Sequence, residues 1–219
     1  KKEILINQEN SYSFIKSKKE GDDFRPLLIG NSIDRYKLKN IGYYIQINLD
    51  GIDYKNLNEI DEKILLIRIS KDFRCYYDTD KMICLNALNV ICKKGYSQYD
   101  LKYIIGILNS KLYKSYADFK ITSGAELTIR LSNDIMRSIP IKKINFSDFS
   151  KNQSHNQIVS LVDQMLEEQK KYHSAKTEKD ETFYKREIDR LDNEIDRLVY
   201  QLYELTPEEI AIVEESVKK

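Results

Sequence analysis

The sequence is poor in proline and glycine, which limits the enzyme chemistry it can carry. Its three prolines, Pro26, Pro140 and Pro207, are never adjacent. Amino-methyltransferases hold a flipped base with a Pro-Pro-aromatic motif after Asp or Asn, so that motif is missing here. The seven glycines are all isolated, whereas loops that bind nucleotides or methyl donors need clustered glycines. We therefore expect no catalytic residue and no bound cofactor in this chain.

Cysteine and histidine are also scarce. The three cysteines, Cys75, Cys84 and Cys92, and the two histidines, His155 and His173, do not have the spacing of a zinc site. An odd number of widely spaced cysteines is typical of a reducing compartment. We expect no metal site and a cytoplasmic location.

Long apolar runs are absent as well. No stretch approaches a membrane span and no signal peptide opens the chain, so we expect no membrane partner. The first residue is Lys rather than Met, and we interpret the chain as a piece of a longer protein. A nuclease-like set can be drawn through Asp53, Asp61 and Lys63, but a chain with 32% charged residues produces such sets by chance.

Charge is distributed unevenly, although the net charge is only +1. Residues 1–150 carry 25 Lys and Arg against 19 Asp and Glu, whereas residues 151–219 carry 11 against 16. A basic first part suits a polyanionic partner, and an acidic second part suits a protein partner. An excess of this size is common in ordinary domains, so charge alone does not establish nucleic-acid binding.

The pattern between residues 63 and 92 is typical of short β-strands. Ile64 to Ile69 is an apolar, β-branched run interrupted by one arginine, which predicts a buried strand. Phe73 to Tyr77 is a second strand candidate, and Asp78 to Lys81 has the composition of a turn. Met82 to Leu85 and Leu88 to Cys92 add two short strands. We predict a sheet that presents basic side chains at its rim.

The same stretch resembles a known family. Its order Lys-Ile-Leu-x-x-Arg-Ile-Ser, then Tyr-Asp, then Cys-Leu-Asn-x-Leu is similar to the target-recognition domain of bacterial DNA methyltransferases and restriction-modification enzymes. The group it resembles is the TaqI-like C-terminal specificity domain of type IIG enzymes. Arg25 to Gly30, Ile33 to Tyr36 and Ile105 to Leu112 fit the same family. The similarity covers roughly residues 24–145 and continues more weakly to about residue 213.

The resemblance implies that the chain recognises double-stranded DNA by sequence. Base edges in the major groove are read by Arg, Lys, Asn, Gln, Ser and Thr, and phosphates bind Arg and Lys. Glu62 and Ile67 stand where the family often has proline and a second basic residue. Arg68 lies inside an apolar run, so the alternative to a DNA contact is a buried arginine with a structural role. The candidate DNA contacts are Arg35, Lys37, Arg68, Lys71, Arg74, Lys120, Thr122 and Ser123.

Helical periodicity follows this sheet. Apolar positions predict a helix over about residues 98–118, with Ser97 and Asp100 as a variant of the capping box. Apolar and polar residues alternate over Glu126 to Leu131, which predicts a strand. Ile139 to Ile141 is predicted as an edge strand because its proline cannot donate to a ladder.

Two long helices are predicted for the C-terminal part. The first runs from Ser154 to about Ala175, before a charged break at residues 176–181. Thr206 and Pro207 begin a last short helix. The second long helix carries an a/d heptad pattern, at Tyr184, Ile188, Leu191, Ile195, Leu198, Leu202 and Leu205. The pair is similar to the paired helices of type I specificity subunits, which bind methyltransferase subunits; the simpler interpretation is a hairpin that packs on itself.

We therefore predict an α/β (α+β) recognition domain at residues 1–150 with a mixed, mostly antiparallel sheet, followed by a long helical hairpin at residues 151–219. The resemblance implies an upstream methyltransferase domain or subunit, adenine-specific and using S-adenosylmethionine, with or without a fused nuclease. Two alternatives stay open. One is half of a type I specificity subunit, and the other is a protein-interaction module built on the helical hairpin that does not bind DNA.

Overall fold

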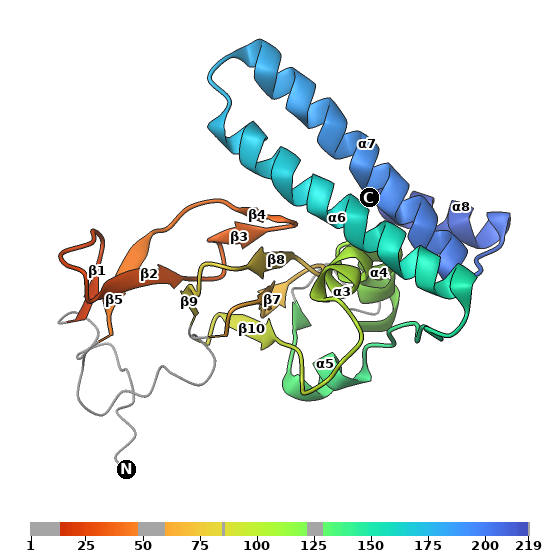
Figure 1. Cartoon of the computed structure of the whole chain (residues 1–219), viewed down its shortest axis with the longest axis horizontal. Coiled ribbons are helices and arrows are strands. Elements are labelled where there is room, and N and C mark those ends of the chain that lie inside the picture. The colour runs from red at the N-terminus through yellow and green to blue at the C-terminus, as the bar shows by residue number, and fades with distance from the viewer. Residues whose placement is uncertain (1–13, 48–59, 85, 122–128, 219) are drawn as a thin grey trace.

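Short strands form one side of the molecule and a long helical hairpin projects from the other (Figure 1). The computed structural model describes residues 14–47, 60–84, 86–121 and 129–218. The strands are β1 (Ile15–Lys16), β2 (Phe24–Leu28), β3 (Ile33–Asp34), β4 (Lys37–Leu38), β5 (Tyr43–Gln46), β6 (Lys63–Ile67), β7 (Ile69–Ser70), β8 (Cys75–Asp78), β9 (Ile83–Cys84), β10 (Leu88–Ile91) and β11 (Ile129–Arg130). The helices are α3 (Leu101–Leu108), α4 (Lys111–Tyr116), the π-helical turn η1 (Ala117–Ile121), α5 (Asn133–Ser138), α6 (Phe149–Ser174), α7 (Glu178–Leu202) and α8 (Pro207–Ser216).

The strands pair as a mixed, mostly antiparallel system, which confirms the predicted fold class. A four-stranded sheet has the order β1-β5-β2-β9, a three-stranded sheet has the order β10-β6-β8, and β11-β7 and β3-β4 form two small pairs. Only the pairing of β2 with β9 is parallel among the described strands. The predicted strand over Glu126 to Leu131 is represented by β11, and residues 122–128 lie outside the described part.

Strand β6 is central because both of its faces are buried. Side chains alternate along a strand, so Ile64 and Leu66 enter the core that includes α3, α6 and α7, whereas Leu65 and Ile67 enter a second core. A strand covered on both faces is largely apolar, and β6 is apolar from Ile64 to Ile67, as the sequence predicted. It ends at Ile67 rather than Ile69, because the backbone of Arg68 bonds to two other segments.

The single helix predicted over residues 98–118 is divided. Asp100 is the N-cap of α3, where its side chain accepts from the N–H of Lys102, so Ser97 does not start the helix. The helix breaks at Asn109 because that side chain bonds to both backbone groups of Cys75, at 2.9 and 3.0 Å. Ser110 then caps α4. The break therefore fixes α3 to β8.

The predicted edge strand over Ile139 to Ile141 is wrong, since this segment is irregular. Tyrosine hydroxyls take the place of a strand partner. Tyr113 donates to the carbonyl of Pro140, Tyr103 donates to the carbonyl of Lys142 at 2.8 Å, and Tyr203 accepts from the N–H of Lys142 at 2.9 Å. Backbone groups of this partly exposed connection are thus paired without a strand partner.

Helices α6 and α7 form the predicted hairpin, which we call the helical arm. Helix α6 begins at Phe149 rather than Ser154, capped by Asp148, and α7 begins at Glu178, capped by Thr177, so the charged break is short. The heptad positions from Ile188 to Leu202 are buried. Thr206 caps α8 with a capping box and Pro207 at its first turn, as predicted.

The helical arm packs on α3 at close range. A Cβ placed on Gly106 would lie 2.8 Å from a methyl of Ile158 and 3.1 Å from a methyl of Val162. Glycine therefore lets α3 and α6 approach each other. One core contains side chains of β6, β8, α3, α6 and α7, so apolar packing continues across the predicted boundary near residue 150, which stays a prediction.

Within the described residues, no helix combines the length and the apolar character that crossing a membrane requires.

Candidate nucleic-acid interface

A groove of about 630 Å³ opens where five segments of the strand region meet. It contains Arg68, Lys71 and Arg74, three of the predicted DNA contacts. We call it the basic groove; its lining residues are Gly30, Asn31, Lys39, Ile67, Arg68, Ile69, Ser70, Lys71, Arg74, Asn86 and Ala87. Four of these side chains are cationic and none is a carboxylate.

Backbone hydrogen bonds hold the two arginines at the same rim. The N–H of Ile67 donates to the carbonyl of Arg74 at 3.2 Å. The N–H of Arg68 donates to the carbonyl of Ala87 at 3.1 Å, and its carbonyl accepts from the N–H of Leu131 at 2.8 Å. Arg68 is therefore fixed from two sides. The tight connection from β7 to β8 brings both arginines together, as the sequence predicted.

The side chain of Arg68 is half-buried at the wall of the groove. Its Nη1 donates to the carbonyl of Asn86 at 3.4 Å, which is a long hydrogen bond. Its Nε is buried and has no partner among the described residues. One donor of this guanidinium therefore has no acceptor among the described residues, and an unpaired buried donor is unfavourable.

Arg74 is oriented by a neighbouring carboxylate. Its Nε donates to Oδ1 of Asp72 at 2.7 Å, and the hydroxyl of Ser70 donates to the same oxygen at 3.2 Å. The hydrogen bond to Asp72 raises the pKa of the Arg74 guanidinium. This hydrogen bond uses Nε alone, so among the described residues the terminal nitrogens have no acceptor. Because Nε is held by Asp72, the two terminal nitrogens of the planar guanidinium have a fixed orientation and can donate side by side.

The two lysines of the groove differ in their partners. Lys71 is exposed. Lys39 forms an ion pair with Asp34, with 2.9 Å between Nζ and Oδ2. Burial opposes ionisation of Asp34, but hydrogen bonds from Lys39 and from the Arg35 N–H outweigh it, so the pKa of Asp34 lies below its ordinary value. Lys71 is thus the freer cation.

Arg35 does not line the basic groove. Its Nη1 and Nη2 donate to the two carboxylate oxygens of Asp192 on α7, at 3.1 and 2.6 Å. This bidentate pair connects the β3 region to the helical arm. A DNA contact by Arg35 stays a prediction, and the observed partner of its guanidinium is a carboxylate of this chain.

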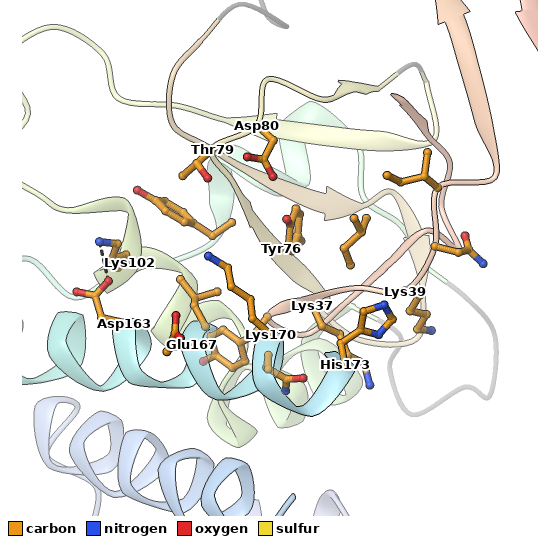
Figure 2. Close-up of a pocket in the computed structure, with 17 residues that line it drawn as sticks. Lys37, Lys39, Tyr76, Thr79, Asp80, Lys102, Asp163, Glu167, Lys170 and His173 are labelled. Atoms are coloured by element: carbon orange, nitrogen blue, oxygen red, sulfur yellow. Dashed lines mark ion pairs between the residues drawn. The ribbon is translucent and has the colours of Figure 1, made fainter. Parts of the chain in front are cut away.

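Lys37 lines a second hollow of about 590 Å³, between the strands and α6. We call it the arm cleft (Figure 2). Lys37, Lys39 and His173 lie at one end of it, and the Lys102–Asp163 ion pair, at 2.7 Å, lies at the other. Its lining contains four lysines but also three carboxylates. Mixed charge suits a polyanion less well than the basic groove does.

The remaining predicted contacts lie elsewhere. Lys120 is exposed in η1 and does not line the basic groove. Thr122 and Ser123 lie outside the described residues. The sequence analysis did not predict Asn31 and Asn86 as contacts. Asn86 belongs to the Cys-Leu-Asn-x-Leu stretch that suggested the family, which is the signal that could have identified it, whereas Asn31 lies between two such stretches.

The described residues contain no group of three or more His, Cys, Asp or Glu side chains placed to hold a metal ion. Lys63 is fully buried and forms an ion pair with Asp78 at 3.0 Å. Its ammonium is therefore shielded from any substrate, which removes it from the nuclease-like set.

Comparison with known proteins agrees with this arrangement. The model of the TaqI-like C-terminal specificity domain matches residues 25–141. No curated protein matches the chain. Among solved structures, the chain is similar to the one described as the type IIL restriction-modification enzyme MmeI in complex with DNA, with a TM-score of 0.57 and 14% identity. The match covers 94% of this chain and 34% of that chain, so this chain spans about a third of the length of that enzyme.

Proposed function

The chain belongs to the family of TaqI-like C-terminal specificity domains, and we propose that it recognises a base sequence in double-stranded DNA for a restriction-modification enzyme. The observation that carries the proposal is the basic groove, which gathers four cations and no carboxylate at its lining. The structure similar to this chain is a restriction-modification enzyme with DNA, and the likeness itself concerns the fold.

The groove offers the side chains that read bases. The forks of Arg68 and Arg74 match the two acceptors of guanine, and the amides of Asn31 and Asn86 match the donor and acceptor of adenine. Both arginines are fixed by backbone or carboxylate bonds, which reduces the entropy lost on binding. We assign base reading to these four residues. Lys71, which is exposed, is assigned to phosphate.

Catalysis is proposed for an upstream part of the protein. That part would be an adenine-specific methyltransferase domain or subunit that binds S-adenosylmethionine, with or without a fused nuclease of the type IIG kind. The isolated glycines of this chain do not form a loop for that methyl donor. The acidic helical arm is the proposed docking element for the methyltransferase part. Its neighbouring rings Phe183 and Tyr184 lie 5.5 Å apart, and Phe183 is exposed.

Two alternatives stay open. Half of a type I specificity subunit would also bind DNA through the basic groove and would also dock methyltransferase subunits through the helical arm. A protein-interaction module built on the helical hairpin would bind no DNA. The salt dependence of DNA binding separates the last alternative from the others.

The test is a titration of duplex DNA with the full-length protein at several salt concentrations. Each phosphate contact contributes about 0.9 to the slope of log K against log salt. Lys71→Ala should therefore weaken binding to all sequences alike and flatten that slope by about one unit. Lys179→Ala, at an exposed position of α7, should change neither. Absence of DNA binding by the full-length protein at low salt would refute the proposed function.

A further inference from the structure

One exposed apolar side chain lies inside the basic groove. Ile69 is 59% exposed and lines the groove. The other large exposed hydrophobic side chains of the described residues lie outside that lining; they are Tyr43, Tyr96, Phe119, Phe149, Phe183 and Ile212. Scattered apolar side chains on a surface need no explanation. An exposed isoleucine in a groove lined by four cations does need one, because cations attract water to the groove.

The backbone around Ile69 is fixed on both sides. Strand β7 pairs with β11, where Ile69 stands opposite Arg130 and Ser70 opposite Ile129. The preceding residue, Arg68, is bonded to Ala87 and Leu131. Ser70 is buried, and successive side chains of a strand point to opposite faces. Ile69 therefore points outward from a strand whose backbone is paired with β11.

The cross-strand neighbour adds a further cation. Arg130 is exposed, and residues directly opposite in an antiparallel pair have neighbouring side chains on the same face. Arg68 directly precedes Ile69, Lys71 follows it two positions later, and Arg130 stands opposite it across the strands. An apolar side chain among donors is suited to a ligand surface that combines an apolar group with acceptors.

We propose that Ile69 contacts the 5-methyl group of a pyrimidine in the DNA major groove. This inference rests on the proposed function and adds the kind of base that the groove prefers. Thymine presents its methyl group beside an acceptor oxygen, and the neighbouring bases present further acceptors. Isoleucine is stiff at its first side-chain torsion, so its methyl groups occupy a defined place. Thymine and 5-methylcytosine share this chemistry, and the experiment distinguishes them.

The experiment uses the full-length protein that contains this chain. Its preferred site is first selected from a pool of random duplexes. Each A·T pair of that site is then replaced singly by A·U, which removes only the methyl group. Each G·C pair is replaced in separate duplexes by G·5-methylcytosine. The proteins compared are the wild type, Ile69→Ala, Ile69→Val and Ile212→Ala. The last is a matched control, because Ile212 is also an isoleucine and is 58% exposed, on α8.

The wild type should lose about threefold to fivefold in affinity at one A·U position, which is the effect of one methyl group. Ile69→Ala should bind A·T and A·U equally at that position, Ile69→Val should keep part of the difference, and Ile212→Ala should match the wild type. A gain on G·5-methylcytosine that Ile69→Ala lacks would support the same contact with cytosine as the source.

Two results would overturn the inference. One is equal discrimination of the methylated and unmethylated duplexes by the wild type and Ile69→Ala. The other is an equal loss on every duplex for Ile69→Ala, which would assign Ile69 to the fold or to a protein contact. If the wild type selects no preferred sequence, the proposed function fails as well. A preferred sequence without any methyl dependence refutes the role of Ile69 alone.

Discussion

The interface of α3 with the helical arm and the basic groove are built in opposite ways. At the helix interface, Gly106 lets two helices touch, and Ile158, Val162 and Ile195 are fully buried around it. At the groove, β7 and β11 have two residues each, and the important side chains are half-exposed or exposed. The first region is fixed by apolar packing, and the second by a few backbone hydrogen bonds. Substitutions should therefore affect folding in one region and binding in the other.

The largest expected effect is at the helical arm. Leu198→Asp should lower the free energy of unfolding by about 3–5 kcal/mol, because Leu198 is 8% exposed and a buried charge without a partner is costly. Since one core joins β8 to α7, helix and strand signals should be lost in a single transition. Circular dichroism during urea unfolding measures both. Thr182→Asp, at an exposed position of the same helix, should change stability by less than about 0.5 kcal/mol.

If the helical signal were lost while the strand region stayed folded, the two parts would be independent. That result would support a domain boundary near residue 150. It would also show that the core shared by strands and helices does not make the two parts unfold together.

The next effect depends on pH. Asp196 is 1% exposed and accepts from the N–H of Lys111 at 2.8 Å. Burial raises its pKa from 3.8 to about 6. The folded state therefore binds the proton more tightly than the unfolded state, and this contribution to stability is lost as pH rises from about 4 to 6. For a shift of this size the loss is roughly 3 kcal/mol.

Asp196→Asn removes this dependence, because asparagine does not ionise and its carbonyl still accepts from Lys111. The stability of the variant relative to the wild type should rise between pH 4 and pH 7. Urea unfolding at several pH values measures this difference. A difference that stays constant with pH would show that Asp196 is already ionised in the folded protein at pH 4.

The helix interface was largely predictable from the sequence, because burial leaves a periodic pattern. The heptad positions from Ile188 to Leu202 are buried in α7 as predicted, whereas Leu205 lies beyond the end of that helix. The predicted buried strand is present as β6, although it ends at Ile67 rather than Ile69. The break at Asn109 was not, since the apolar stripe continues through it and the cause is a pair of hydrogen bonds to a strand residue 34 positions away. Local periodicity does not record such a contact.

The groove was predicted only in part, because exposed residues leave no periodic pattern. Arg68, Lys71 and Arg74 were selected together since they flank one short connection. Arg35 was selected for its charge, and nothing local indicates that Asp192 lies beside it. Asn31 and Lys39 reach the groove from other segments through tertiary folding alone. The resemblance to the family identified the part of the sequence that forms the groove. The structure was needed to show which side chains line it.

The third prediction concerns Arg35. Its side chain does not line the basic groove and instead donates two hydrogen bonds to Asp192 on α7. Arg35→Ala should lower the free energy of unfolding by about 1.5–3 kcal/mol, as for loss of a charged hydrogen bond. A double-mutant cycle with Asp192→Ala measures the coupling between the two residues. The sequence preference of DNA binding should stay the same. If stability is unchanged while DNA affinity falls, Arg35 contacts DNA, as its charge first suggested.

The smallest expected effect is on sequence preference at the groove. Arg74→Ala in the full-length protein should relax the preference at one base pair by about 1–3 kcal/mol, because its fork, held by Asp72, no longer reaches a guanine. Arg74→Lys keeps the charge but not the planar fork, so it should lose the same preference while retaining the salt dependence. Arg137→Ala is the matched control, since Arg137 is exposed on α5. Binding to all single-base variants of the selected site measures each effect. A uniform loss on every variant would make Arg74 a phosphate contact or a fold residue, and base reading would then rest on Arg68 and the two asparagines.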